Sequence, residues 1–188
     1  MGLFSLEAGN TAYRADFWVY GAAVPLLAFM LVAAGPRASW PLLVVCTAAG
    51  LASWSLVEYG LHRFVLHRVE PFQRWHGEHH RRPTALIGTP TLMSAALFAT
   101  LVFAPGWALA GAWPAAAFTL GMLAGYLAYV VIHFATHHAA HPALARTGWL
   151  RQRRRWHALH HKRLDAPGCY GVTSGFWDHV FGSKGPSA

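Results

Sequence analysis

Histidines at fixed spacings are the residues of this sequence best suited to chemistry. Two segments share the pattern HxxHH, each with a tryptophan directly before its first histidine: residues 75–80 read WHGEHH and residues 156–161 read WHALHH. On a helix, positions i, i+3 and i+4 share one face, so each segment is expected to aim three imidazoles at one point. Imidazole nitrogen suits iron, zinc and copper, and the pattern therefore indicates a transition-metal site.

Two further pairs bring the histidine clusters to four. His133 and His137 lie about 40° apart on a helix and are expected to face one metal together. His62 and His67 lie about 140° apart on a helix, so they are expected to straddle the site, serving different metals or crossing a helix end. Ten histidines, enough for two metals, are thus predicted as ligands: His62, His67, His76, His79, His80, His133, His137, His157, His160 and His161.

Three remaining histidines fall outside these spacings. His138 and His141 lie beside the HxxxH pair, and His179 lies in an aromatic stretch near the end of the chain. We expect them to support the ligands or to lie on the surface. Cys46 and Cys169 are far apart in sequence, and neither a disulfide nor a thiolate metal site is predicted from them.

The elements that position the histidines are predicted to be membrane helices. Hydrophobic residues make up 55% of the chain and charged residues 12%, and the apolar residues gather in long uncharged runs. An 18-residue helix is about 27 Å long, close to the thickness of the bilayer core. We therefore predict an all-α integral membrane protein with four transmembrane helices in two hairpins, at residues 17–34, 40–57, 86–104 and 113–132.

Glycine and proline mark features within these runs. Pro90 is expected to kink the third helix, and Pro105 and Gly106 are expected to turn the chain before the fourth. Gly121 and Gly125 form a GxxxG pattern, which is read either as a close-packing contact or as the ordinary glycine content of membrane helices.

The topology places both histidine blocks, residues 58–84 and 133–182, on one side as a helical cap that carries the dimetal site. With four spans, 14 of the 15 Lys and Arg residues share that side, Arg37 being the exception, and the positive-inside rule makes it the cytoplasm. Residues 1–16 are expected to be a retained tail, and residues 1–188 a single membrane-embedded domain. The net charge of +8 then reflects topology, and nucleic-acid binding is not expected because no recognition module accompanies it.

The motifs between residues 58 and 182 resemble one family in order, spacing and flanking aromatics. They read EYGLHRFVLH at 58–67, WHGEHH at 75–80, GYLAYVVIHFATH at 125–137, WHALHH at 156–161 and YGVTSGFWDHVFG at 170–182. This set resembles the fatty acid hydroxylase superfamily (sterol desaturase/fatty acid hydroxylase), and most closely its fatty acid 2-hydroxylase branch. The family's metal ligands fall on the ten histidines named above.

The resemblance implies an oxidoreductase: a membrane monooxygenase with two iron ions that hydroxylates a C–H bond of a lipid acyl chain with O2. Zinc can replace iron in purified samples. Some 2-hydroxylases carry a fused cytochrome-b-type haem domain, for which this chain has no room, so a separate electron donor is implied, ferredoxin-like or of the cytochrome b type. A carotenoid or sterol-type substrate is the alternative within the superfamily.

Two other classes of protein fit less well. A metal transporter needs polar ligands near the middle of the bilayer, whereas the four apolar runs contain neither charge nor histidine. A purely structural membrane protein leaves the ligand spacings of the histidines without a reason.

Overall fold

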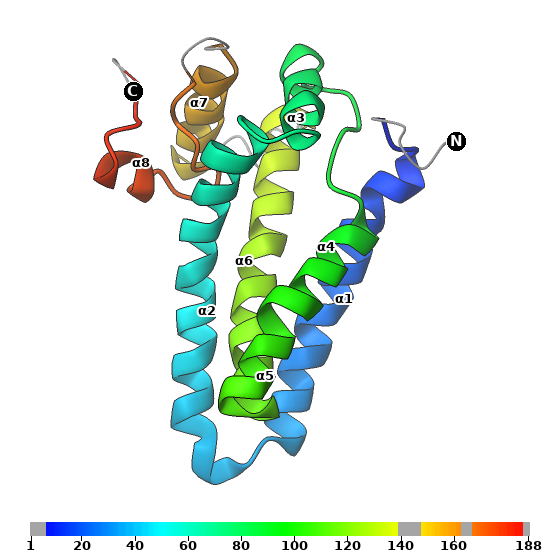
Figure 1. Ribbon diagram of the computed structural model, residues 1–188, viewed down its shortest axis with the longest axis vertical. Helices are drawn as coiled ribbons and strands as arrows, with labels where there is room; N and C mark the ends of the chain where they lie inside the picture. The colour runs from blue at the N-terminus through cyan, green and yellow to red at the C-terminus, as the bar shows by residue number, and fades with distance from the viewer. Residues whose placement is uncertain (1–6, 139–147, 163–166, 186–188) are drawn as a thin grey trace. The chain divides into compact units, whose positions relative to one another are not determined.

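Every regular element in the described part of this computed structural model, residues 7–138, 148–162 and 167–185, is a helix (Figure 1). His141 lies outside the described residues. In chain order the elements are α1 (Asn10–Ala34), the 3-10 helix η1 (Arg37–Ser39), α2 (Trp40–Gly60), the π-helix η2 (Leu61–Leu66), α3 (Phe72–Arg81), α4 (Thr91–Leu97), the π-helix η3 (Phe98–Phe103), α5 (Ala104–Ala110), α6 (Ala112–His138), α7 (Gly148–Lys162) and α8 (Phe176–Val180).

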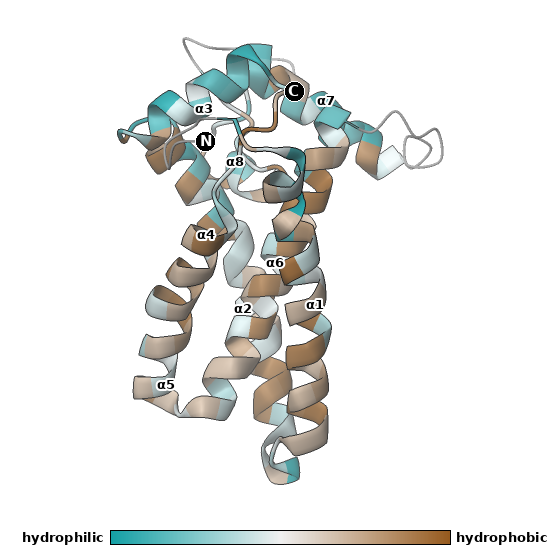
Figure 2. Cartoon of the chain, turned by 90° about the vertical axis from the view of Figure 1, so that its right-hand side faces the viewer, coloured by the Kyte–Doolittle hydropathy of each residue, from teal (hydrophilic) through white to brown (hydrophobic). Residues whose placement is uncertain are grey.

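Four helical stretches are long and apolar enough to cross a membrane. They are Asn10–Ala34, Arg37–Leu66, Thr91–Ala110 and Ala112–His138. Figure 2 shows α1, α2, α4 and α6 in mainly hydrophobic colours, whereas α3 and α7 are mainly hydrophilic. Large apolar side chains on these stretches are exposed, among them Phe29 at 68% and Leu109 at 88%, as expected for helices that face lipid. The all-helical, integral-membrane class is therefore confirmed.

The third stretch differs from its predicted form at both ends. Pro90 does not kink a helix, because it precedes the first residue of α4, where a missing N–H costs no hydrogen bond. Pro105 and Gly106 do not turn the chain either, since both lie in the first turn of α5, directly after η3. The helix ends instead at Gly111, whose φ of 86° favours glycine and whose N–H donates to the carbonyl of Trp107 at 3.0 Å.

The chain divides into two compact units. Among the described residues, the apolar unit comprises residues 8–54 and 88–127, and the other comprises residue 7 and residues 55–87, 128–138, 148–162 and 167–185. The apolar unit buries a small core of Leu31, Leu43, Ala116 and Ala117. A single domain over residues 1–188 stays a prediction.

Close packing of α2 on α6 in the apolar unit explains the GxxxG pattern. A Cβ atom at Gly121 would lie 2.0 Å from the carbonyl oxygen of Thr47, and one at Gly125 would lie 2.5 Å from Cβ of Trp54. Real Cβ atoms do not approach other atoms this closely. The close-packing interpretation of the two glycines is therefore correct.

Candidate metal centre

The two HxxHH segments form α3 and α7, and each divides its histidines between two groups of converging nitrogens. In α3, His76 and His80 belong to the first group and His79 to the second. In α7, His160 belongs to the first group and His157 to the second. The expectation that one segment aims three imidazoles at one point was wrong: positions i and i+4 lie about 40° apart, but i+3 lies about 60° away from i on its other side.

The π-helix η2 brings the two histidines of the HxxxxH pair close together. Its i→i+5 hydrogen bonds put His62 and His67 about one turn apart, and the two ring centroids are 5.3 Å apart. His67 follows the last residue of η2, so the pair does cross a helix end, as one expectation had it. Both rings belong to the first group, so the other expectation, that the two serve different metals, was wrong.

The first group contains five histidines whose Nε2 atoms converge: His62, His67, His76, His80 and His160. The Nε2 atoms of four of these histidines form a closed ring in which neighbouring nitrogens are 3.0–3.1 Å apart, in the order His67, His160, His80 and His76. The Nε2 atom of His62 lies 3.0 Å from that of His76. The centre of a square with edges of this length would lie about 2.2 Å from each nitrogen, close to the roughly 2.0–2.1 Å of a metal–imidazole bond. The first group therefore has the dimensions of a metal site.

The second group forms around the polar end of α6. The ligand atoms of His79, His133, His137 and His157 all lie within 4.8 Å of one another. The Nε2 atoms of His137 and His157 are 2.7 Å apart, and the Nε2 atom of His161 lies 3.0 Å from that of His157. Nine of the ten predicted histidines thus fall into groups of five and four, and His161 joins the second group through its contact with His157.

Hydrogen bonds alone do not account for these contacts. The Nε2 atom of His76 lies within 3.0–3.1 Å of three other Nε2 atoms, but a ring nitrogen carries at most one hydrogen to donate. Neither buried ring nitrogen of His79 has a hydrogen-bond partner. Nitrogens that converge without shared protons are the expected arrangement around a metal ion, and an all-imidazole set fits iron, zinc or copper.

Burial keeps these imidazoles neutral. Burial, and then the charges of His80 and Arg68, lowers the pKa of His67 from 6.5 to about 4, and burial lowers the pKa of His80 to about 4. In the second group, burial followed by neighbouring histidines lowers the pKa of His79 to about 3 and that of His161 to about 2. Neutral imidazole is the form that binds metal, so the rings are ready to bind near pH 7.

Two backbone carbonyls orient ligands of the first group. The Nδ1 atom of His62 lies 2.5 Å from the carbonyl oxygen of Tyr170, and that of His160 lies 2.7 Å from the carbonyl oxygen of Gly168. A carbonyl only accepts, so each Nδ1 carries the hydrogen and each Nε2 keeps a free lone pair.

Asp178 holds the loop that supplies these carbonyls. Its fully buried carboxylate accepts hydrogen bonds from the N–H of Tyr170 at 2.9 Å and of Gly171 at 2.8 Å. The hydroxyl of Ser183 donates to the same carboxylate at 2.8 Å.

Glu58 holds the next part of the loop. Its buried carboxylate accepts hydrogen bonds from the N–H of Val172 at 2.6 Å and of Thr173 at 2.9 Å, and from the Thr173 hydroxyl at 2.5 Å. The sequence analysis assigned no role to Glu58 or Asp178. The available signal was an acidic residue at the end of an apolar run and another inside an aromatic stretch.

Two histidines outside the predicted set remain outside both groups. The ring of His138 stacks on Phe134, with centroids 4.6 Å apart. The ring of His179 stacks on Trp156, and its Nδ1 atom lies 2.6 Å from the carbonyl oxygen of Gly175.

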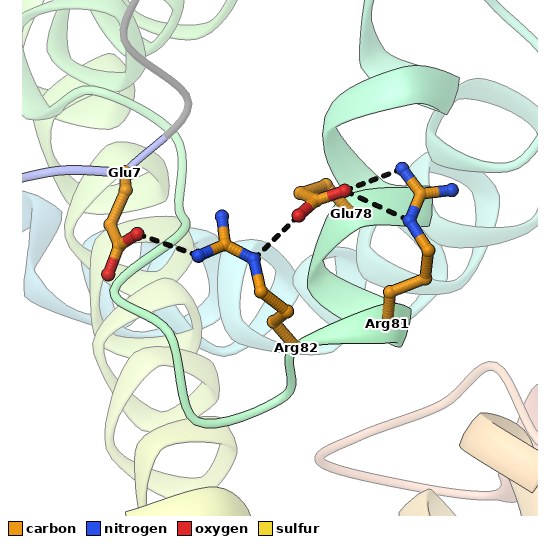
Figure 3. A network of polar contacts seen from close by, with 4 residues as sticks. All are labelled: Glu7, Glu78, Arg81 and Arg82. Atoms are coloured by element: carbon orange, nitrogen blue, oxygen red, sulfur yellow. Dashed lines mark hydrogen bonds and ion pairs between the residues drawn. The ribbon is translucent and has the colours of Figure 1, made fainter.

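A cavity of about 850 Å³ borders the first group at His67 and His80. Arg81, on its lining, is already paired, because its guanidinium contacts the carboxylate of Glu78 at 2.5 Å (Figure 3). The same carboxylate contacts Arg82 at 2.6 Å, and Arg82 also contacts Glu7 at 2.9 Å. This exposed network lies at the C-terminal end of α3.

Comparison with known proteins identifies similarity to fatty acid hydroxylases. The profile of the family described as "Fatty acid hydroxylase" matches residues 47–183. Dihydroceramide fatty acyl 2-hydroxylase FAH2 of Arabidopsis thaliana is 29% identical over 93% of this chain and 80% of its own length. Ceramide very long chain fatty acid hydroxylase SCS7 of Saccharomyces cerevisiae is 37% identical over 74% of this chain.

The chain spans 38% of the length of that yeast relative. Among solved structures, full length scs7p, in which only the hydroxylase domain is visible, matches with a TM-score of 0.70. The match covers 97% of this chain and 69% of the other at 23% identity, and it shows a shared fold.

Proposed function

Since this chain belongs to the fatty acid hydroxylase family, we propose that it hydroxylates the acyl chain of a membrane lipid at the carbon next to the carbonyl, with O2 as the co-substrate. The relatives from Arabidopsis and Saccharomyces are named as a fatty acyl 2-hydroxylase and a ceramide fatty acid hydroxylase. Their names support an acyl substrate over a carotenoid or a sterol.

The observation that carries the proposal is the pair of converging histidine groups. Each gathers neutral imidazole nitrogens at metal-binding distances, and we infer that each holds one iron ion. Bound iron would supply the oxygen-activating chemistry that an unactivated C–H bond requires. The protein contributes ligand orientation through the carbonyls of Gly168 and Tyr170, and burial that keeps the ligands neutral.

The reaction requires an electron donor. One oxygen atom of O2 enters the product and the other becomes water, so each turnover consumes two electrons and two protons. We propose a separate donor, ferredoxin-like or of the cytochrome b type, that docks on α7. Its exposed arginines Arg151 and Arg155 offer positive charge to an acidic carrier.

The proposed topology has two helical hairpins in the membrane and a helical cap on the cytoplasmic side. The cap carries the histidine groups, and both chain ends lie on its side. The distribution of Lys and Arg supports this orientation, since Arg37, the first residue of the second candidate span, is the one Lys or Arg of the sequence that this topology places on the opposite side. Electrons from the cytoplasm and lipid from the membrane then reach the same centre.

Mass spectrometry of total lipids tests the proposal. A host expressing the protein is compared with one expressing the His160→Ala variant, and both are searched for lipids with one added oxygen. We expect 2-hydroxy acyl lipids only with the unaltered protein. Oxygenated carotenoids or sterols in their place would assign the alternative substrate, and no oxygenated lipid from an iron-loaded protein with a reductant would contradict the proposal.

A further inference from the structure

The cavity beside the first histidine group is strongly basic. Besides His67 and His80, its lining includes four arginines, Arg63, Arg68, Arg74 and Arg81, and one acidic residue, Glu70. Its volume of about 850 Å³ lies within the range of small-molecule sites. A basic cavity that is lined by two candidate metal ligands can hold an anion close to the reacting centre.

Two of these arginines carry a charge that no ion pair neutralises among the described residues. Among the described residues, no carboxylate forms an ion pair with Arg68 or Arg74, whereas Arg81 is paired with Glu78. Both side chains are exposed and can turn toward a ligand. Guanidinium groups bind carboxylate and phosphate oxygens in pairs of parallel hydrogen bonds.

Arg63 is held in place on the lining. It donates a hydrogen bond to the Tyr59 hydroxyl, and its guanidinium carbon lies 5.8 Å from the ring centroid of Tyr170. Tyr170 also lines the cavity, and its carbonyl orients His62. A fixed arginine therefore lines the cavity beside Tyr170, whose carbonyl orients a histidine of the first group.

The position of hydroxylation links this cavity to the substrate, and the link rests on the function proposed above. Carbon 2 of an acyl chain is bonded to the carboxyl carbon, so the polar end of the substrate must lie within a few bond lengths of the reacting centre. Space for that end is available in the cavity at His67 and His80. We propose that this cavity binds an oxyanion, a carboxylate or a phosphate, at the polar end of the acyl substrate.

An anionic polar end would distinguish this chain's substrate from a neutral ceramide. A neutral lipid gains nothing from unpaired guanidinium groups, whereas an anionic one gains charge-assisted hydrogen bonds. A fatty acid places its carboxylate at the carbon next to the reacting one, and an acidic phospholipid places a phosphate further along.

Lipid binding, measured without turnover, tests the inference. The metal-loaded protein in neutral detergent is titrated with palmitate, dipalmitoyl phosphatidic acid or N-palmitoyl sphingosine, and binding is followed by native mass spectrometry. We expect one or both anions to bind at least about tenfold more tightly than the ceramide. Tighter binding of palmitate identifies a carboxylate site, and tighter binding of phosphatidic acid a phosphate site. Equal affinity for all three lipids would overturn the proposal.

Charge-matched variants locate the site. Arg68→Gln with Arg74→Gln should weaken binding of the preferred anion about tenfold and leave ceramide binding unchanged. The control, Arg151→Gln with Arg155→Gln, removes the same charge from α7 and should leave lipid binding unchanged. An equal loss in both pairs would indicate general charge attraction and overturn the proposal.

Turnover separates this inference from the proposed function. The cavity pair should raise the KM for the anionic lipid and leave the KM for the electron donor unchanged; the reverse would make the cavity a donor site and overturn the inference. Anion binding through Arg68 and Arg74 without hydroxylation of any lipid would contradict the function and leave the anion site standing. Efficient hydroxylation of ceramide without preferential anion binding would do the opposite.

Discussion

The two histidine groups differ in how their imidazole rings are held. In the first group, the carbonyls of Tyr170 and Gly168 orient His62 and His160, and a basic cavity borders the group. In the second group, the buried Nδ1 atoms of His157 and His161 have no hydrogen-bond partner. Backbone carbonyls thus orient two rings of the first group, which also borders a cavity, whereas two rings of the second group have no hydrogen-bond acceptor at Nδ1.

Removing one ligand from each group should have the largest effect. His160→Ala should remove the metal of the first group and His157→Ala that of the second, because each ring belongs to one group. We expect one metal per chain to be lost in each case, and turnover to fall at least about 100-fold in both. Metal content by inductively coupled plasma mass spectrometry checks this, and full metal with full product in either variant would break the division into two groups.

Asp178→Asn should weaken the first group selectively. The amide nitrogen cannot accept a hydrogen bond, so at least one N–H of Tyr170 or Gly171 loses its acceptor and the loop that orients His62 and His160 is released. We expect metal affinity of the first group to fall about 10- to 100-fold.

The matched control is Glu78→Gln, which removes a carboxylate from the exposed network of Figure 3. It should leave both metals bound and the melting temperature unchanged. Equal metal loss in Asp178→Asn and Glu78→Gln would show that the loop does not orient the first group.

Acid should act on the metal-free fold before it acts on the bound metals. The pKa values of His67 and His80 are lowered to about 4, while the unfolded chain titrates near 6.5. Between these values the unfolded chain binds more protons, so the stability contributed by neutral histidines is complete above pH 6.5 and is lost as the pH falls toward 4. Thermal melting of the metal-free protein across this range checks the sign, and a melting temperature that rises on acidification would contradict it.

The same pKa values bear on where acid competes for bound metal. Because histidine ligands must be neutral, an ordinary imidazole pKa predicts metal loss as the pH falls below about 6. Burial lowers the pKa of His67 and His80 to about 4 and that of His79 to about 3, so protons should compete for either group only at a lower pH. Metal analysis after stepwise dialysis to lower pH checks this, and loss of the metals already near pH 6 would contradict it.

The smallest effect is expected from histidines outside both groups. His138→Ala and His179→Ala should leave two metals per chain, because these rings stack on Phe134 and Trp156 and neither belongs to a group. Loss of a whole metal in either variant would add that histidine to the ligand set.

Periodicity and composition were enough to predict the four membrane helices and the ten histidines, because apolar runs and ligand spacings are local properties of the chain. The π-helix η2 was not predictable in this way, since an α-helical reading of His62 and His67 separates rings that the i→i+5 spacing brings together. Pro105 was read as a turn because a proline interrupts an α-helix, yet here η3 ends just before it.

The features of the site that the sequence did not predict depend on contacts between residues far apart in the chain. The roles of Glu58 and Asp178 depend on a loop more than a hundred residues from Glu58 in sequence, and no local spacing signals that the carboxylates hold it. The division of each HxxHH segment between two groups likewise depends on which neighbours α3 and α7 face. That the ten histidines bind metal stays a prediction.

Anomalous X-ray diffraction at the iron edge, from protein purified out of iron-supplemented cells, tests the central claim most directly. The account predicts two peaks per chain, one among the Nε2 atoms of His62, His67, His76, His80 and His160, and one among the ring nitrogens of His79, His133, His137, His157 and His161. Zinc-edge peaks at both positions would keep the two sites and change only the metal in the sample. A single peak, or ions away from these nitrogens, would contradict the account.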